Sequence, residues 1–399
     1  MSVSPRRSIH LLPALTVLFL LSSLLIILSG CEKKMVCSTV PTFFPPPPDE
    51  PRIQYLTGIT SITDIGDTKK EQSTFSLVLT GQQEADIIRK IGKSFGLVVY
   101  NSKLYIAESG FGRVVIVDPV KGTIEYPKGM QSPHGALKSP VSLALDGEGY
   151  LYVADTGRNE IVVYDPAGNF LTSFGKDFGK IFGFNPRIVG VAVFGGKLYV
   201  LDMGTQRIRV LDRKTGEETT EPFGYIEKPN QSLRKPGNFA MDAQGNFYVT
   251  NIGNNMVMKY DIDGNFIGSF GGSGDQISMF VKPKGIALDD ANRIYVVDGG
   301  TNIVQLFDDQ FRLLTLFGWP GLETGSLNMP AGITVTSDKN LLQYFKKYAV
   351  KGFELENLIF VVNQYGQEFC IPRISVYGLG QMQDKKAATP DAQEKKSGQ

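Results

Sequence analysis

The stretch Leu151-Tyr152-Val153-Ala154-Asp155 decides the fold, because six versions of it recur along the chain. Each version is a run of mainly apolar residues that ends in a polar residue, which is typical of a short buried strand. The versions occupy residues 104–108, 151–155, 198–202, 247–251, 294–298 and 359–363. Their starts lie 47 to 49 residues apart, except for a last interval of 65. A period near this length indicates a repeat array.

Each repeat holds further apolar segments around this central strand. A strand that often begins at a proline, as at Pro140 and Pro283, comes before it, and a third strand follows it. The turns between the second and third strands contain Gly157, Gly204 and Gly253, which we expect to supply the positive φ of a chain reversal. A hairpin then leads into a fourth strand. Four antiparallel strands in each period predict one propeller blade.

Six repeats therefore predict an all-β fold, a six-bladed β-propeller. A single four-stranded sheet cannot bury both of its faces, so the sheets must stack around an axis. The last repeat lacks a fourth strand, whereas residues 52–59 read as a strand with no blade before it. We expect this N-terminal strand to complete the last blade and close the ring. Residues 341–356 form an insertion in that blade, whose apolar spacing suits a short amphipathic helix as far as Val350.

The start of the chain has the layout of an export signal. Arg6 and Arg7 precede an almost charge-free apolar run over residues 11–28. The run ends in Leu-Ser-Gly-Cys, which resembles a lipobox, so residues 1–30 are predicted to be a signal peptide and Cys31 to carry lipid. The other interpretation is an uncleaved transmembrane helix. A lipidated Cys31 would anchor the protein outside the cytoplasm, and Glu32 after it favours the outer membrane.

Composition assigns the segments that flank the repeats. Residues 31–51 read as a linker that prolines 45–48 stiffen into a spacer, and residues 384–399 read as a disordered polar tail. The propeller then spans residues 52–383. Cys37 and Cys370 either form a disulfide or remain two thiols in an oxidising compartment. The formal net charge of +1 does not support strong nucleic-acid binding.

The repeat resembles the NHL repeat, whose pattern is roughly Pro-x-Gly-Ile-Ala-x-Asp and then Tyr-Val-Ala-Asp-x-Gly-Asn. Residues 283–289 and 152–157 match it closely, and the resemblance covers about residues 95–380. It implies the fold and no single function, because this repeat serves many activities.

With the Val-x-Asn-Gln-Tyr-Gly motif ending at Gly366, the chain is similar to bacterial NHL-repeat lipoproteins that often accompany multihaem cytochromes. This resemblance implies a partner in an electron-transfer complex. Residues 367–372 depart from it, because a tight turn would be expected there.

Polar residues at the ends of the six second strands are the first candidate site. Because the strands of a blade are antiparallel, these side chains should form a ring on one face of the propeller. One interpretation makes them ligands of a calcium-like divalent cation in the channel. The other makes them hydrogen-bond acceptors for backbone amides of their own turns. The six residues are Glu108, Asp155, Asp202, Asn251, Asp298 and Asn363.

The sequence offers few other catalytic candidates. After removal of the predicted signal peptide, His134 is the one histidine left, which does not support a zinc site built from His ligands. No Cys-x-x-Cys-His, Gly-x-Ser-x-Gly or phosphate-loop motif occurs. We therefore predict no catalytic residue and no cofactor, apart from the calcium-like cation considered above. Loops on a rigid frame usually carry binding residues, and the candidates for a partner surface are Trp319, Arg158, Arg207 and Asn254.

Three functions remain as hypotheses. The first is a lipid-anchored protein-binding or scaffolding module, associated with a cytochrome complex. The second is a metal-dependent hydrolase or lyase, similar to lactonases, that uses the acidic ring at the channel mouth. The third is glycan or peptide binding in the channel, for which the aromatic content is the one indication.

Overall fold

The computed structural model describes residues 37–61, 64, 91–179, 181, 183, 185–226, 228–366 and 370–383. The predicted signal peptide, the lipidation site Cys31 and the tail 384–399 lie outside these residues. Within the described ranges, no helix is long and apolar enough to cross a membrane.

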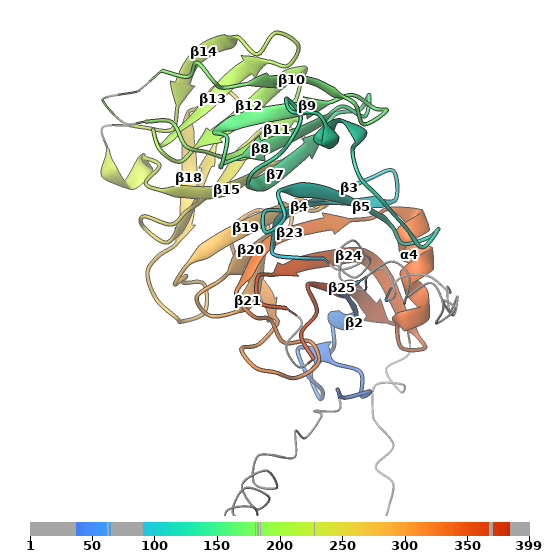
Figure 1. The fold of residues 1–399 in the computed structure, drawn as a ribbon. Coiled ribbons are helices and arrows are strands. Elements are labelled where there is room, and N and C mark those ends of the chain that lie inside the picture. The colour runs from blue at the N-terminus through green and yellow to red at the C-terminus, as the bar shows by residue number, and fades with distance from the viewer. Residues whose placement is uncertain are drawn as a thin grey trace, which may run out of the picture. The chain divides into compact units, whose positions relative to one another are not determined.

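Six antiparallel sheets form the body of the protein (Figure 1), which confirms the predicted six-bladed β-propeller. Blade 1 contains β3 (Ser94–Tyr100), β4 (Lys103–Glu108), β5 (Arg113–Asp118) and β6 (Thr123–Glu125). Blade 2 contains β7 (Pro140–Leu145), β8 (Leu151–Asp155), β9 (Glu160–Tyr164) and β10 (Phe170–Phe174). Blade 3 contains β11 (Ile188–Phe194), β12 (Lys197–Asp202), β13 (Arg207–Asp212) and β14 (Glu218–Phe223).

The second half of the ring repeats this arrangement. Blade 4 contains β15 (Pro236–Met241), β16 (Phe247–Asn251), β17 (Met256–Tyr260) and β18 (Phe266–Gly271). Blade 5 contains β19 (Pro283–Leu288), β20 (Ile294–Asp298), β21 (Ile303–Phe307) and β22 (Leu313–Phe317). Blade 6 contains β23 (Pro330–Thr336), β24 (Phe353–Asn363), β25 (Ile374–Met382), β2 (Ile53–Ile59) and β1 (Phe43–Phe44). Short 3₁₀ turns, η2 (Lys128–Gln131) and η3 (Pro229–Gln231), lie in two connections between blades.

The N-terminal strand closes the ring, as predicted. β2 pairs antiparallel with β25, with Gln54 opposite Gly378 and Thr57 opposite Val376, so the two ends of the propeller share one sheet (Figure 1). The first strand of each blade contacts the first strand of the next blade, and β23 contacts β3. The six first strands therefore surround a central channel, and no blade is left without two neighbours.

The hydrophobic core is divided among the interfaces between blades. Six clusters of buried side chains are present in the described residues, and each joins two neighbouring blades. In one of them, Tyr152 of blade 2 packs with Val191 and Leu198 of blade 3. Full burial of one such side chain contributes about 1.5–3 kcal/mol. Stacking of the blades thus buries the faces that a single sheet would leave in water.

The turns between the second and third strands differ from the prediction, which was wrong about where the positive φ lies. The left-handed residue is the one before the third strand, such as Asn159 (φ 58°) and Asn302 (φ 60°). Glycine is needed earlier in the turn for a different reason. A Cβ on Gly204 would lie 2.1 Å from the carbonyl oxygen of Asn185, and one on Gly253 would lie 2.3 Å from that of Arg234. The blade connections therefore pack directly against these turns.

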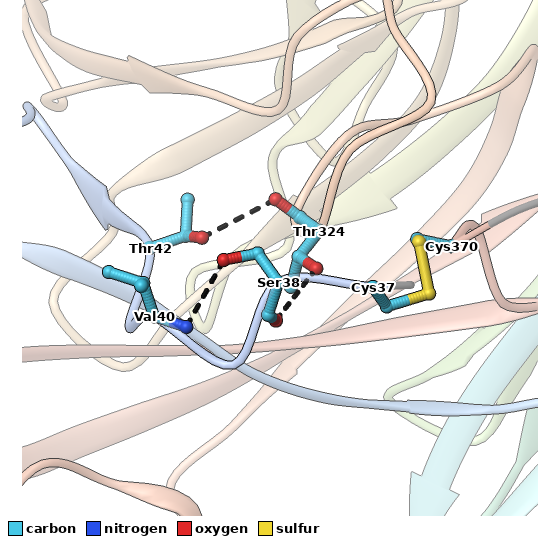
Figure 2. The surroundings of a disulfide bond; sticks show 6 residues. All are labelled: Cys37, Ser38, Val40, Thr42, Thr324 and Cys370. Carbon is cyan, nitrogen blue, oxygen red and sulfur yellow. Dashed lines mark hydrogen bonds between the residues drawn. A yellow bond between two sulfur atoms is a disulfide. The ribbon is translucent and has the colours of Figure 1, made fainter. Parts of the chain in front are cut away.

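Part of the predicted linker belongs to the propeller. Residues 43 and 44 form β1 against β2, and Phe44 is fully buried against Phe317, Trp319 and Tyr377. A disulfide joins Cys37 to Cys370 across a sequence separation of 333 residues (Figure 2). The structure thus contains one of the two alternatives left open for these cysteines. Aromatic contacts, which proline content does not reveal, hold this segment in place.

The insertion of blade 6 contains a helix, as predicted, but this helix ends before Val350. Helix α4 (Lys339–Phe345) continues into the 3₁₀ turn η4 (Lys346–Tyr348), and β24 begins at Phe353. Asp338 caps the helix by accepting a hydrogen bond from the N–H of Leu341 at 2.9 Å. Leu341 and Phe345 enter the cluster between blades 6 and 1. The helix therefore covers the interface at which the ring closes.

Candidate functional site: the ring face

One face of the propeller carries all six predicted ring residues. We call it the ring face, and it is the face at which the first strands begin and the second strands end. The register shows this directly, because each ring residue pairs with the first residue of the neighbouring first strand. The turns after the second strands and the connections between blades also emerge here.

The six ring side chains are fully buried. Each accepts a hydrogen bond from a backbone N–H of the segment that leads into the first strand of its own blade. The donors are Gly92 for Glu108, Lys138 and Ser139 for Asp155, Arg187 for Asp202, Arg234 for Asn251, Val281 and Lys282 for Asp298, and Asn328 for Asn363. The ring residues therefore fasten each connection to the blade that follows it.

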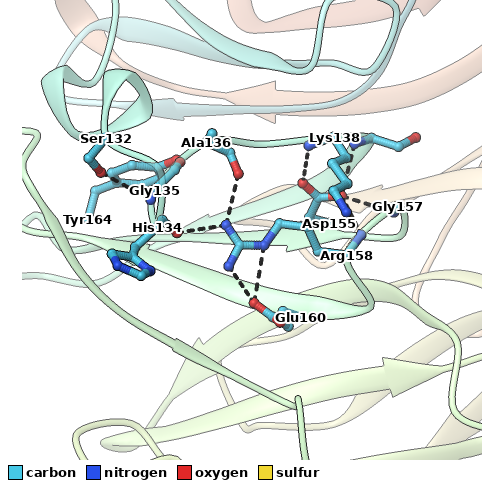
Figure 3. A network of polar contacts seen from close by, with 11 residues as sticks. Ser132, His134, Gly135, Ala136, Lys138, Asp155, Gly157, Arg158, Glu160 and Tyr164 are labelled. Carbon is cyan, nitrogen blue, oxygen red and sulfur yellow. Dashed lines mark hydrogen bonds and ion pairs between the residues drawn. The ribbon is translucent and has the colours of Figure 1, made fainter.

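Asp155 shows the full arrangement (Figure 3). It accepts hydrogen bonds from Lys138 at 2.6 Å and Ser139 at 2.9 Å, and from Gly157 and Arg158 of its own turn at 2.9 and 3.1 Å. The two asparagines adapt this scheme, because the side-chain amide of Asn251 also donates to the carbonyl of Ser232 at 3.1 Å. Each ring residue thus satisfies backbone groups that burial would otherwise leave without water.

The ring residues do not fit a calcium-like cation. Calcium needs several oxygen ligands that converge on one point. Here the carboxylate oxygens point into separate turns, and Asp202 also pairs with the buried Arg209, whose Nε lies 3.0 Å away. In the part of the chain that the structure describes, no three His, Cys, Asp or Glu residues come together as a metal site would require. Among the described residues, the ring side chains are therefore engaged by backbone amides and do not form a cluster of metal-binding groups.

The four candidate partner residues have different surroundings. The guanidinium of Arg158 donates to the carbonyls of His134 and Ala136 and pairs with Glu160 (Figure 3). It therefore fixes the connection between blades 1 and 2. The hydroxyl of Tyr164 donates to the carbonyl of Gly135 in that connection, and burial raises the pKa of Tyr164, which keeps the hydroxyl a donor.

The other three candidates do not form one exposed patch. Arg207 is only 6% exposed and lies with its guanidinium carbon 4.4 Å from the ring centre of Tyr225. Asn254 is half-buried. Trp319 is 43% exposed, and its inner side packs on Phe44 at 5.8 Å between ring centres. Of the four, Trp319 is the one that presents a large exposed side chain.

Two features of the ring face were missed by the sequence analysis. The first is a set of exposed large apolar side chains in its turns and connections, which we call the apolar rim. It consists of Phe111, Tyr225, Ile277, Met279, Val281, Trp319, Leu322 and Tyr365. These residues lie outside the strands, where the alternation of apolar residues carries no signal. Their common placement appears only once the six blades are arranged in a circle.

The second feature is a cationic collar around the channel mouth. It consists of Lys93, Lys138, Arg187, Arg234, Lys235, Lys282 and Lys284, all at or near the start of a first strand. Within the described residues, none of these side chains has an ion-pair partner. A basic residue just before the strand-opening proline, as in Lys235-Pro236 and Lys282-Pro283, was a sequence signal that could have revealed it.

The fold and the ring of buried acceptors define a six-bladed β-propeller, and comparisons with known proteins agree with that class. No protein-family model matches the chain, and no curated protein matches its sequence. It is similar in structure to a protein of unknown function from Bacteroides thetaiotaomicron, with a TM-score of 0.52, 17% identity and coverage of 82% of this chain and 75% of that one.

Two solved enzymes are also among the proteins to which the chain is similar in structure. A gluconolactonase from Xanthomonas campestris is similar with a TM-score of 0.50 and 14% identity over 87% of this chain and 94% of that one. A virginiamycin B lyase from Staphylococcus aureus is similar with a TM-score of 0.47 and 14% identity over 73% of this chain and 96% of that one. At 14% identity the likeness to the gluconolactonase shows the propeller fold alone.

Proposed function

We propose that this chain is a lipid-anchored binding protein that docks a protein partner through the ring face. The observation that carries the proposal is the apolar rim, in which eight exposed large apolar side chains gather on one face. Monomeric proteins rarely expose such groups together, and aromatic side chains concentrate binding energy at interfaces. Trp319 and Tyr225 are the residues of the rim that we expect to contribute most.

The cationic collar indicates the chemistry of the partner. Its basic side chains lie on the same face as the rim and have no ion-pair partner among the described residues. Complementary charge gives an interface its specificity and its rate of association. We therefore propose a partner with an acidic docking surface. The similarity to lipoproteins that accompany multihaem cytochromes supports an extracytoplasmic electron-transfer complex as that partner.

Membrane attachment is part of the same proposal. Lipid on Cys31 would hold the propeller at a membrane, with the outer membrane favoured by Glu32. Two or more acyl chains give stable attachment, so the propeller itself needs no contact with lipid. We expect Cys31→Ala to release the protein into the soluble extracytoplasmic fraction. Recovery of this variant with the membranes would contradict lipid anchoring.

A pair of matched substitutions tests docking on the ring face. Ile277 belongs to the rim and is 69% exposed, whereas Leu171 lies on the outer strand β10 and is 56% exposed. Each is replaced by aspartate in the full chain, which is crosslinked in membranes, extracted in detergent and isolated with its partners. We expect Ile277→Asp to lower the yield of one specific partner about tenfold, because the partner would have to cover an unpaired charge in place of an apolar side chain. Leu171→Asp should leave the yield unchanged.

The same experiment tests the identity of the partner. Haem staining of the isolated complex distinguishes a multihaem cytochrome from another protein. Recovery should also fall as ionic strength rises, because salt screens contacts between exposed charges. Equal recovery with both aspartate variants would contradict the ring-face interface, and a partner without haem would remove the cytochrome from the proposal.

A further inference from the structure

The mouth of the central channel is a cavity of about 400 Å³. Its wall contains the second residue of every first strand, so all six blades contribute one position. That size is in the range of small-molecule sites in proteins. Five of the six positions are apolar or glycine, and the sixth is a lysine. They are Phe95, Val141, Val189, Gly237, Lys284 and Ala331.

The repeat pattern therefore does not require a lysine at position 284. The fold accepts Val141, Val189 or Ala331 at the equivalent place, where each follows a residue paired with a ring side chain. Blade 5 also makes room for the lysine. The residue after the ring position that lines the cavity is Met203, Ile252 or Gln364 in blades 3, 4 and 6, but the equivalent residue of blade 5 is Gly299.

The side chain of Lys284 occupies the space that Gly299 leaves. A Cβ on Gly299 would lie 2.6 Å from Cε and 2.9 Å from Nζ of Lys284. The lysine is half-buried, and within the described residues its Nζ has neither a hydrogen-bond acceptor nor an ion-pair partner. The carboxylate of Asp298 attracts the charge of Lys284, but the oxygens of Asp298 already accept hydrogen bonds from Val281, Lys282 and Gly300.

The charge on Lys284 is costly in the free protein. Burial, followed by repulsion from Lys282 and Lys93, lowers the pKa of Lys284 to about 8, against the smaller opposing effect of Asp298. An ammonium group that is removed from water without a partner destabilises the folded state. Arg187 and Lys235 also line the cavity, and none of its lining residues is acidic. An anion at this place would relieve the repulsion among these groups.

We propose that the channel mouth binds a small organic molecule with a carboxylate or phosphate group, which pairs with Lys284 while its apolar part contacts the channel wall. Arg187, Lys235 and Lys282 add to the attraction at the rim of the cavity. Phe95, Val141 and Val189 supply the apolar contacts. The site goes beyond docking on the apolar rim, because partner binding there requires no ligand in the channel.

Calorimetric titration of the full chain in detergent tests the site. The free-ligand probes are inorganic phosphate, citrate and octanoate. The acidic side chain of a partner is represented by a hexaglutamate peptide, with hexaglutamine as its uncharged control. Lys284→Met removes the charge and keeps the length of the side chain. Lys214→Met is the matched control, because Lys214 is exposed and lies in the turn after β13, outside the cavity.

We expect one or more probes to bind with 1:1 saturation, and Lys284→Met to weaken that binding at least tenfold, which is about 1.4 kcal/mol. Lys214→Met should change it less than twofold. Binding of octanoate or citrate would support a free ligand, whereas binding of hexaglutamate alone would overturn the small-molecule site and assign Lys284 to the docking of a partner. No saturable binding at roughly 10 mM of any probe, or equal binding by wild type and Lys284→Met, would overturn the proposal.

A second measurement does not depend on affinity. An amine with a lowered pKa reacts faster with an acylating reagent at pH 8, and a bound anion protects it. Mass spectrometry should therefore find Lys284 acylated faster than Lys214, and a probe that binds should slow Lys284 selectively. The Ile277→Asp variant should keep this protection, so failure of the anion site and failure of partner docking give different results.

Discussion

Replacement of Asp155 by alanine tests whether the ring residues serve the fold or a metal. The substitution leaves the backbone N–H groups of Lys138, Ser139 and Gly157 without their acceptor. The N–H of Arg158 loses its bond to the carboxylate and keeps the one to the backbone carbonyl of residue 155, at 3.2 Å. A hydrogen bond to a charged group contributes about 1.5–3 kcal/mol. Because the four bonds share two oxygens, we count one bond for each oxygen and expect a loss of about 4 kcal/mol in the free energy of unfolding.

Asp155→Asn is the graded control. It keeps one oxygen for Ser139, Gly157 and Arg158 and loses the bond from Lys138. We expect a loss of about 1–2 kcal/mol. Asparagine can fill the ring position where a backbone carbonyl accepts a hydrogen bond from its side-chain amide. The amide of Asn251 donates to the carbonyl of Ser232, and that of Asn363 donates to the carbonyl of Pro372.

Urea unfolding followed by circular dichroism measures both losses, with and without about 5 mM calcium. Calcium should not change the unfolding midpoint of any variant. A purely structural role of the ring is refuted if Asp155→Ala unfolds at the wild-type midpoint. It is equally refuted if calcium stabilises the wild type and fails to stabilise Asp155→Ala.

Three further predictions follow from particular contacts. Reduction of the Cys37–Cys370 disulfide should lower stability by about 2–4 kcal/mol, seen as a lower melting temperature, and the Cys37→Ser/Cys370→Ser variant should no longer respond to reductant. Lys284→Met should be more stable than the wild type below pH 8, because the pKa of Lys284 in the folded protein, about 8, lies below the ordinary lysine value of 10.5. Urea unfolding at several pH values should show this advantage shrinking as pH rises from 8 towards 10.5, and a constant difference would contradict it. Arg209 is 2% exposed, so Arg209→Ala should leave the buried Asp202 unpaired and cost about 3–5 kcal/mol in urea unfolding, and an unchanged midpoint would contradict that role.

The sequence by itself determined the architecture. The run Leu151 to Asp155 and its five versions predicted the number of blades, because a strand pattern and a repeat period are local properties that the chain displays in order. The unpaired strand near Gln54 predicted ring closure for the same reason, since an open last blade needs a partner. The position of the ring residues also followed from strand direction alone.

Only the tertiary structure decided what these positions contact. Asp155 and Lys138 are 17 residues apart, and their hydrogen bond exists because a connection folds back over a turn. The sequence assigned Phe44 to a linker, whereas in the structure its ring packs against Phe317 and Tyr377. In the sequence, Lys284 occupies only the variable position after Pro283, which carries no signal of its own. Its burial, its missing partner and the cavity around it arise from six strands that lie far apart in the chain, and side-chain environments of that kind are properties of packing.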